Sequence, residues 1–225
     1  MDIVPAILVK TPDDLTSQIV KLSEYFSHFQ IDITDGEFVS DKTIDIDEIA
    51  KALEKVKPET LKNLTFDFDL MVVDYMDALE KIDELSYLIK TLTVLPHASA
   101  ITNYKEIAEL YAQYTVGIAV DPDDSIDTIN QNFDLSVIPT IQIMSVVPGR
   151  QGNPFLEDSL IKIEQLRMVD YRGKIFIDGG VNDKTLPVIL SKKERPDVVC
   201  IGSYLSRANE LKARIKKARA LVSIA

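Results

Sequence analysis

The chain has 225 residues, of which 46% are hydrophobic, and it carries a formal net charge of −11 with a sequence pI near 4.7. This length suits one large α/β domain or two small ones. We expect no binding to nucleic acid or to an anionic membrane surface, because both require clustered Lys and Arg. A small anionic ligand remains compatible with this charge, since backbone amides can attract it at short range.

Cys200 is the single cysteine, and it lies in an apolar run, Val198 to Ile201. It is therefore expected to be a small buried side chain, and no disulfide can form within the chain, which fits a reducing compartment. The sequence begins directly with a strand-like segment and contains no run of about 18 apolar residues, so neither a signal peptide nor a membrane span is predicted. These features indicate a cytoplasmic protein.

Short apolar runs alternate with amphipathic stretches along the whole chain. The pattern predicts strands at residues 3–9, 28–33, 64–71, 92–95, 116–120, 140–144, 174–177 and 198–201. It predicts helices between them at residues 11–26, 44–56, 74–88, 104–114, 124–131, 155–169, 184–190 and 203–222. Eight alternating units of this kind predict an α/β fold, a single (β/α)₈ TIM barrel over residues 1–225. A doubly wound sheet is the main alternative, although it normally has fewer strands and a topological switch point.

Acidic residues stand at the ends of three predicted strands. Asp32 and Asp69 end the second and third, and Asp178 ends the seventh. Because active sites of such barrels lie at the C-terminal mouth, we expect these three carboxylates to converge. Two opposed carboxylates, Asp32 and Asp178, could take a proton from one face of a carbon and return one to the other face, which is epimerisation. The alternative is that each aspartate only caps a following turn, but Asp is disfavoured in strands.

Three adjacent carboxylates cannot all remain ionised without compensation. Either a cation lies among Asp32, Asp69 and Asp178, or one or more of them holds a proton at neutral pH. Both outcomes are typical of functional sites.

Glycines follow the last three predicted strands. A loop containing Gly149 and Gly152 follows the sixth strand, and the pairs Gly179–Gly180 and Gly202–Ser203 follow the seventh and eighth. In barrels these loops commonly bind phosphate through backbone N–H groups. We therefore predict a phosphate site here, the alternative being ordinary turn glycines.

Three further residues lie at strand ends. His97 follows the fourth strand, and a packed or capping role is the default for a lone histidine. Met71 and Met144, at the ends of the third and sixth strands, could line an active site, with core packing as the other role. The sequence has no Ser-His-Asp or Cys-His set in a plausible context.

The chain resembles the ribulose-phosphate 3-epimerase family. The likeness rests on four segments, which are Asp32 to Val39, Asp69 to Val72, Met144 to Gly149 and Ile177 to Asn182. The resemblance implies interconversion of D-ribulose 5-phosphate and D-xylulose 5-phosphate, with Asp32 and Asp178 as the acid/base pair. It also implies a phosphate grip formed by Gly149, Gly152, Gly179, Gly180, Gly202 and Ser203, and it implies self-association into a homo-oligomer.

Several positions depart from the family pattern. The family holds a metal with two histidines and the two catalytic aspartates, and the histidine positions are Gln30 and Asp69 here. A substrate-contacting serine is replaced by Ala6, and a site methionine by Thr34. If a metal is bound, Asp32, Asp69, Asp178 and Gln30 would form an oxygen-only ligand set, which favours Mg²⁺ or Mn²⁺ over Zn²⁺.

Other functions remain open from the sequence. The altered Ala6 and Thr34, together with Arg150, could suit a different ketose phosphate, and the changed metal positions are compatible with a phosphosugar-binding homologue that has lost turnover. A decarboxylase or aldol-type synthase is less favoured, because related barrels place Asp-x-Lys-x-x-Asp on strand three and this chain has no lysine there.

Overall fold

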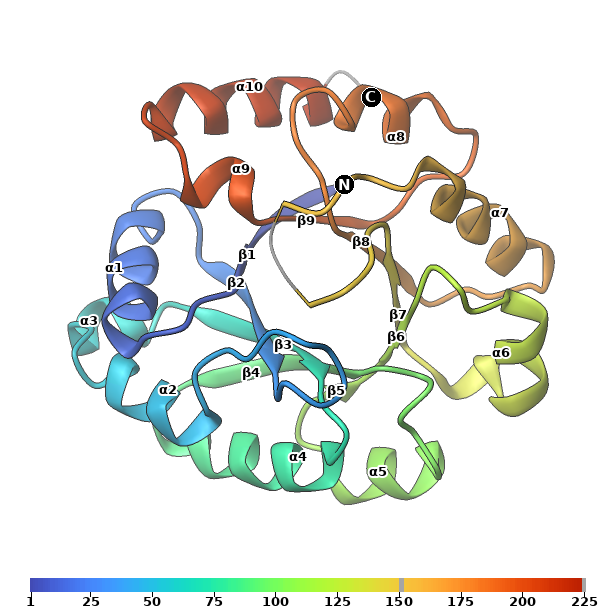
Figure 1. The fold of residues 1–225 in the computed structure, drawn as a ribbon, viewed down its shortest axis with the longest axis horizontal. Helices are drawn as coiled ribbons and strands as arrows, with labels where there is room; N and C mark the ends of the chain where they lie inside the picture. Colours follow the sequence, from blue (N-terminus) through green and yellow to red (C-terminus); the bar gives the residue numbers. More distant parts are fainter. Residues whose placement is uncertain (150–151, 224–225) are drawn as a thin grey trace.

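The computed structural model describes residues 1–149 and 152–223. A ring of parallel strands is surrounded by helices, which confirms the predicted TIM barrel (Figure 1). The strands are β1 (Asp2–Ile7), β2 (His28–Thr34), β3 (Thr65–Met71), β4 (Lys90–Pro96), β5 (Thr115–Val116), β6 (Ile118–Val120), β7 (Thr140–Met144), β8 (Lys174–Asp178) and β9 (Val198–Ile201). Their order is β5-β4-β3-β2-β1-β9-β8-β7-β6.

The fifth predicted strand is divided into β5 and β6 at Gly117, and this is where the barrel closes. β5 pairs with β4, whereas β6 pairs with β7. A Cβ at Gly117 would lie 2.5 Å from the Thr140 carbonyl oxygen and 2.8 Å from a Leu95 methyl, so only glycine allows this close approach. An isolated bridge between His97 and Ala119 joins β4 to β6 beyond the break.

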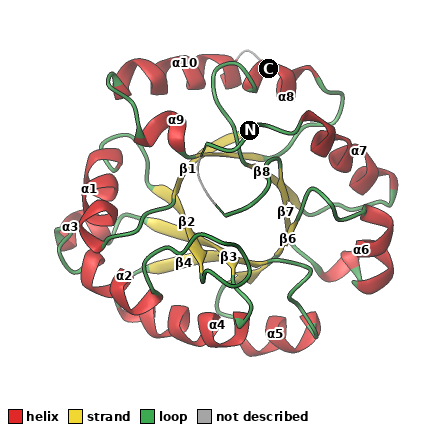
Figure 2. Cartoon of the chain, in the orientation of Figure 1, coloured by secondary structure: helices red, strands yellow, loops and turns green. Residues whose placement is uncertain are grey.

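The α-helices form the outer layer (Figure 2). They are α1 (Pro12–Leu22), α2 (Ile46–Leu53), α3 (Pro58–Leu61), α4 (Tyr75–Glu84), α5 (Tyr104–Leu110), α6 (Ile126–Asn132), α7 (Ile161–Met168), α8 (Leu186–Ser191), α9 (Ser203–Ser206) and α10 (Leu211–Ser223). Single turns of 3₁₀ helix occupy Leu85–Tyr87, Leu135–Val137 and Glu157–Leu160.

The structure differs from the predicted helices at two places. The final helix, predicted over residues 203–222, is divided into α9 and α10, because the chain leaves α-helical geometry at Arg207. The break allows the short α9 to remain at the end of β9, where barrels often place an extra helix. The short α3 was not predicted, and Pro58 at its first turn is a position that proline tolerates in a helix.

Apolar side chains form two separate clusters. The larger lies between the strands and the surrounding helices and includes Leu15, Ile49, Phe66 and Leu79. The smaller contains the inward-facing apolar residues of the strands, which are Val4, Ala6, Leu95, Ala119, Phe176, Val198 and Cys200. Cys200 is 1% exposed, as its apolar run predicted.

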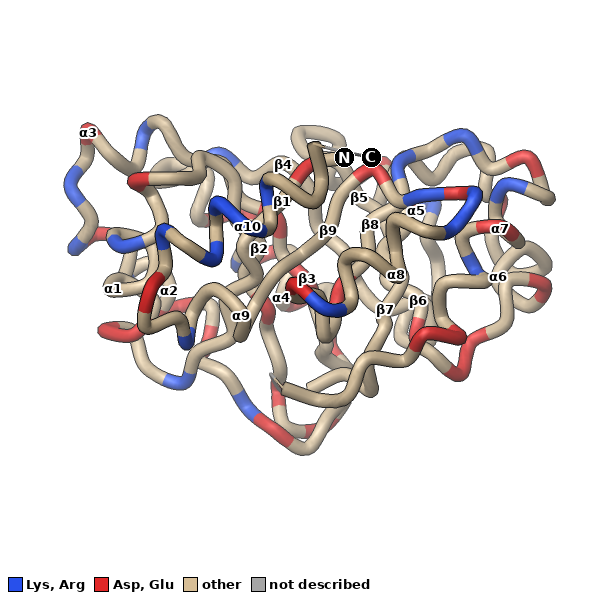
Figure 3. The backbone as a smooth tube through the Cα atoms, turned by 90° about the horizontal axis from the view of Figure 1, so that it is seen from above, with Lys and Arg blue, Asp and Glu red and all other residues tan. Residues whose placement is uncertain are grey.

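Charged residues lie mainly on the outer helices and loops, where Lys and Arg are interspersed with Asp and Glu (Figure 3). None of the helices in the described ranges combines the length and the apolar character needed to cross a bilayer.

Candidate active site

A cavity of about 400 Å³ opens at the C-terminal ends of the strands. It is lined by the residues that the sequence singled out for catalysis, phosphate binding and substrate contact. These are Asp32, Met71, Met144, Gly149, Gly152, Asp178, Gly179, Gly180, Gly202 and Ser203. Strand ends and loops that are far apart in sequence therefore meet at one mouth.

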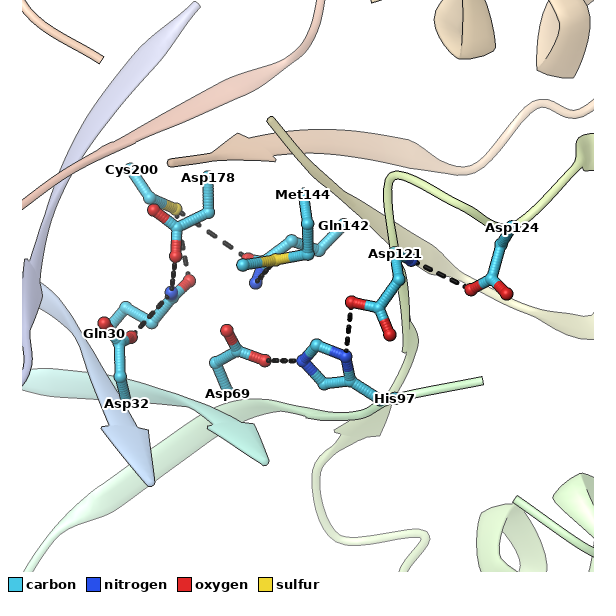
Figure 4. Close-up of polar contacts among 10 residues, drawn as sticks. All are labelled: Gln30, Asp32, Asp69, His97, Asp121, Asp124, Gln142, Met144, Asp178 and Cys200. Atoms are coloured by element: carbon cyan, nitrogen blue, oxygen red, sulfur yellow. Dashed lines mark hydrogen bonds and ion pairs between the residues drawn. The ribbon is translucent and has the colours of Figure 1, made fainter. Parts of the chain in front are cut away.

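Asp32 and Asp178, which line this cavity, converge with Asp69, as predicted, and we call these three residues the carboxylate cluster. One carboxylate oxygen from each lies within 4.8 Å of the others. Asp32 and Asp69 are direct partners in the register of β2 and β3, whereas Asp178 comes from β8, with β1 and β9 between β8 and β2. Asp32 and Asp178 are 6% and 7% exposed, and Asp69 is fully buried. Figure 4 shows the three side chains pointing toward one another.

Burial and mutual repulsion raise the pKa values of both aspartates that line the cavity. Burial is the largest cause for Asp32, and the charges of Asp178 and Asp69 add to it, so its pKa lies well above the ordinary value. Burial and then the charge of Asp69 raise the pKa of Asp178 to about 7. A carboxyl pair of this kind holds a proton at neutral pH and can serve as both acid and base.

Gln30 bridges the two cavity-lining aspartates. Its Nε2 donates hydrogen bonds to Asp32 Oδ1 at 3.0 Å and to Asp178 Oδ2 at 2.8 Å. Its Oε1 faces away from the cluster and accepts from Cys200 Sγ at 3.1 Å. The hydrogen bonds lower the pKa values of both carboxyl groups, opposing burial.

His97 is fully buried and lies between two carboxylates, an arrangement that the default packing role did not predict. Its Nε2 is 3.2 Å from Asp69 Oδ1, and its Nδ1 is 2.9 Å from Asp121 Oδ1 (Figure 4). Burial acts to lower the pKa of His97, but Asp69 and Asp121 outweigh it and raise the pKa to about 10. The imidazolium therefore supplies a positive charge beside the carboxylate cluster.

The fit of a metal at this site depends on the atoms that face it. The three carboxylates could together hold a divalent cation, and Asp69 Oδ2 is buried with no hydrogen-bond partner among the described residues. Gln30 does not fit the ligand role suggested for it, because its N–H groups rather than its oxygen face Asp32 and Asp178. An amide donor cannot bind a cation through the same atom.

The glycine loops form the other end of the cavity. Gly179 has a φ of +110°, and a Cβ there would lie 2.5 Å from Val146 Cγ2, so the turn after Asp178 requires glycine. Ser145, the residue after β7, fixes this turn, because its backbone N–H donates to the Asp178 carbonyl at 2.6 Å and its hydroxyl to the Gly179 carbonyl at 2.7 Å. These bonds position Asp178 at the cavity wall. Arg150, in the neighbouring loop, lies outside the described residues.

Two cations lie near the glycine loops, and the sequence patterns did not indicate them. Lys184 lines the cavity, and Arg207 Nη1 lies 3.6 Å from the position that a Cβ would take at Gly152. Lys184 follows Gly179–Gly180, after β8, and Arg207 follows Gly202–Ser203, after β9. Their proximity to Gly152 and Ser203 gives the glycine end a positive character within a strongly acidic chain.

The loop after β2 covers part of the mouth. Asp35 holds this loop by accepting hydrogen bonds from the backbone N–H groups of Phe38 and Val73, each at 2.7 Å. The Phe38 ring packs edge-on against His97 with 5.0 Å between ring centroids. The loop therefore shields the imidazolium from solvent above the cavity.

The fold and the site define a barrel enzyme in which two buried carboxyl groups face one cavity. The family model described as the Ribulose-phosphate 3 epimerase family matches residues 2–206. The chain therefore belongs to this family, and it is an enzyme of the isomerase class.

Curated relatives agree with this assignment. A ribulose-phosphate 3-epimerase from Methanocaldococcus jannaschii is 28% identical over 195 residues, which cover 85% of this chain and 77% of the relative. A ribulose-phosphate 3-epimerase from Bacillus subtilis is 29% identical over 201 residues, covering 84% of each chain.

Solved structures support the fold alone. The 3-hexulose-6-phosphate synthase from Salmonella typhimurium matches with a TM-score of 0.65 at 16% identity over the full length of both chains. KGPDC from Streptococcus mutans in complex with D-R5P matches with a TM-score of 0.68 at 12% identity, covering 99% of this chain and 97% of that one.

Proposed function

We propose that this epimerase interconverts D-ribulose 5-phosphate and D-xylulose 5-phosphate by proton transfer between two aspartates. The observation that carries the proposal is the single cavity that joins Asp32 and Asp178 at one end to the glycine loops at the other. A ketose phosphate has the same two parts, a reacting carbon near the carbonyl and a phosphate at the far end.

The proton moves in two steps. The carboxylate of one aspartate, Asp32 or Asp178, removes the proton from C3, and the electron pair of the C–H bond passes into an enediolate spanning C2 and C3. The carboxylic acid of the other aspartate then gives its proton to the opposite face of C3. The raised pKa values of Asp32 and Asp178 support one group acting as the base and the other as the acid, because the pair retains a proton at neutral pH.

The glycine loops hold the phosphate and orient the sugar. Backbone N–H groups around Gly149, Gly179 and Gly202, with the Ser203 hydroxyl, would bind phosphate oxygens. Met71 and Met144 would pack against the sugar between the two ends. Binding energy from the phosphate then positions C3 between the carboxyl groups.

If a metal is bound, Asp32, Asp69 and Asp178 would hold it, and it would supply positive charge to the developing enediolate. A ligand set made only of carboxylates favours Mg²⁺ or Mn²⁺ over Zn²⁺. We further propose that residues 1–225 act as one cytoplasmic domain that self-associates, on the basis of the family resemblance and the single buried cysteine.

Ala6 favours a second candidate, epimerisation of a different ketose phosphate. It lines the cavity where the family pattern has a serine, so one hydroxyl that could select the sugar is missing. Such a pocket would accept a substrate with a different arrangement near Ala6, which is buried on β1 beside Gln30.

The test is incubation with D-ribulose 5-phosphate in deuterium oxide, followed by proton NMR. We expect deuterium to enter at C3 while D-xylulose 5-phosphate accumulates, with D-fructose 6-phosphate reacting much more slowly. Faster exchange in the hexose phosphate would favour the second candidate, and binding without exchange in either sugar would contradict epimerisation.

A further inference from the structure

Gln30 is held in one orientation by what surrounds it. The amide N–H₂ group faces Asp32 and Asp178 and donates to one carboxyl oxygen of each. The opposite side of the amide faces the Cys200 thiol, which donates to Oε1. Gln30 is fully buried, so water does not compete with these contacts. A turned amide would place an oxygen against the two aspartates and would lose the 3.1 Å contact with the Cys200 thiol, whose other acceptor is Gln142 Oε1 at 3.9 Å.

This orientation opposes a cation at the carboxylate cluster. The two N–H bonds of Gln30 end on Asp32 Oδ1 and Asp178 Oδ2 and direct partial positive charge at them. A divalent cation bound through these same two oxygens would have to displace this donor, because the two cannot share the space between them. Gln30 and a metal are therefore alternative partners of Asp32 Oδ1 and Asp178 Oδ2.

The third carboxylate has its own partner. His97 Nε2 faces Asp69 Oδ1, and Nδ1 faces Asp121 Oδ1, so both ring nitrogens lie against carboxylate oxygens. Both nitrogens can donate only when the ring carries a positive charge. Two neutral N–H donors from Gln30, and the imidazolium that His97 shares between Asp69 and Asp121, thus direct positive charge at the carboxylate cluster.

We propose that the chain's own side chains balance the carboxylate cluster, with Gln30 bridging Asp32 and Asp178 and His97 holding Asp69, so that the enzyme works without a bound divalent metal. This inference rests on the proposed epimerisation. The sequence left open whether a cation or a proton compensates the three aspartates, and the inference selects the outcome without a metal. Gln30 and His97 act as positioning residues, because each reaches the reacting carbon only through an aspartate.

The test measures metal binding directly and compares two buried glutamines of the barrel. Gln30→Glu removes the bridging N–H group and adds a fourth carboxylate to the site. Gln142→Glu is the matched control, because Gln142 is also fully buried, but its Nε2 faces Met144 Sδ at 3.5 Å instead of the aspartates. Each purified protein is assayed for metal content by mass spectrometry and for Mn²⁺ affinity by calorimetry.

We expect the unchanged protein to carry far less than one equivalent of any divalent metal, and its Tm and its exchange rate with ribulose 5-phosphate to be unaffected by a chelator. Gln30→Glu should bind Mn²⁺ roughly tenfold or more tightly than the unchanged protein, with a Tm that rises on adding Mn²⁺, and Gln142→Glu should not. If Gln30→Glu does not fold, Gln30→His replaces it, with Zn²⁺ as the probe and the same expectation.

Stoichiometric metal in the unchanged protein, with loss of Tm on chelation, would overturn the inference. Equal Mn²⁺ affinity in the unchanged protein and Gln30→Glu would also overturn it. Metal content and Tm need no substrate, so these results stand apart from the deuterium exchange that tests the proposed reaction.

Discussion

Asp67 and Asp69 lie two residues apart on β3, both fully buried and both facing a histidine, yet their surroundings differ. Asp67 Oδ2 lies 2.7 Å from His28 Nε2, near the N-terminal end of the barrel, and we call these two residues the lower pair. Asp69 faces His97 at the mouth, and its carboxylate also belongs to the carboxylate cluster. The lower pair is a single contact, whereas Asp69 is coupled to Asp32 and Asp178.

The difference shows that one strand can contribute one aspartate to stability and another to the active site. Every second residue of β3 faces the inside of the barrel. Asp67 and Asp69 therefore both point inward, Asp67 nearer the N-terminal end of the strands and Asp69 nearer the mouth. His28 is 29% exposed in its side chain and His97 is fully buried. Aspartates near the mouth are therefore expected to control turnover, and the lower pair to affect stability alone.

The largest expected contrast is in turnover. Asp32→Asn and Asp178→Asn should each lower kcat by roughly 10²–10⁴-fold, because each removes one of the two proton-transfer groups. Asp67→Asn should leave kcat close to that of the unchanged protein. Steady-state epimerisation assays on the three folded variants measure this contrast, and near-normal turnover in both mouth variants would refute the two-base mechanism.

The next contrast is in stability. His97→Gln should lower the free energy of unfolding by about 3–5 kcal/mol, because it leaves two carboxylates beside an uncharged amide in a buried site. His28→Gln should cost less, since water can reach the partly exposed end of the lower pair.

The stabilisation that His97 provides should depend on pH in one direction. The pKa of His97 is 6.5 when unperturbed and about 10 in the fold, so its contribution is complete below pH 6.5 and is lost as the pH rises through 10. Urea unfolding of both variants from pH 6 to 10 checks this. Equal losses of unfolding free energy in His97→Gln and His28→Gln at every pH would contradict the expected difference between the two histidines.

A smaller effect concerns the pH profile of turnover. The charge of Asp69 helps to raise the pKa of Asp178 to about 7, so Asp69→Asn should lower that pKa. The limb of kcat/KM near pH 7 should then move to more acidic pH, whichever direction of the reaction is followed. Asp67→Asn is the control and should leave the limb in place; a limb unmoved by Asp69→Asn would argue against their coupling.

The last expected effect is a gain in stability. The pKa of Asp178 is 3.8 when unperturbed and about 7 in the fold, so ionising Asp178 destabilises the native state increasingly between these values. Asp178→Asn should therefore match the unchanged protein in Tm near pH 4 and exceed it at pH 8. Thermal scans at both values test this, and a variant that is less stable at pH 8 would contradict the sign.

The sequence by itself determined the barrel, the strands that end in aspartate and the glycine loops. Alternating apolar runs and helical spacing are local properties, and a carboxylate at the end of a parallel strand must lie at the mouth. Asp32, Asp69 and Asp178 could be brought together by this rule alone. The family resemblance added the expected pair of pentose phosphates, but not the state of the metal positions.

Only the tertiary structure decided how those charges are compensated. Gln30 meets Asp178 across 148 residues of sequence, and the direction of its amide depends on Cys200, which lies on a third strand. From the sequence, His97 was expected to be an ordinary packed residue, and only the structure shows Asp121 against its second ring nitrogen. Such contacts depend on side-chain orientation inside a closed barrel, and no spacing along the chain encodes it.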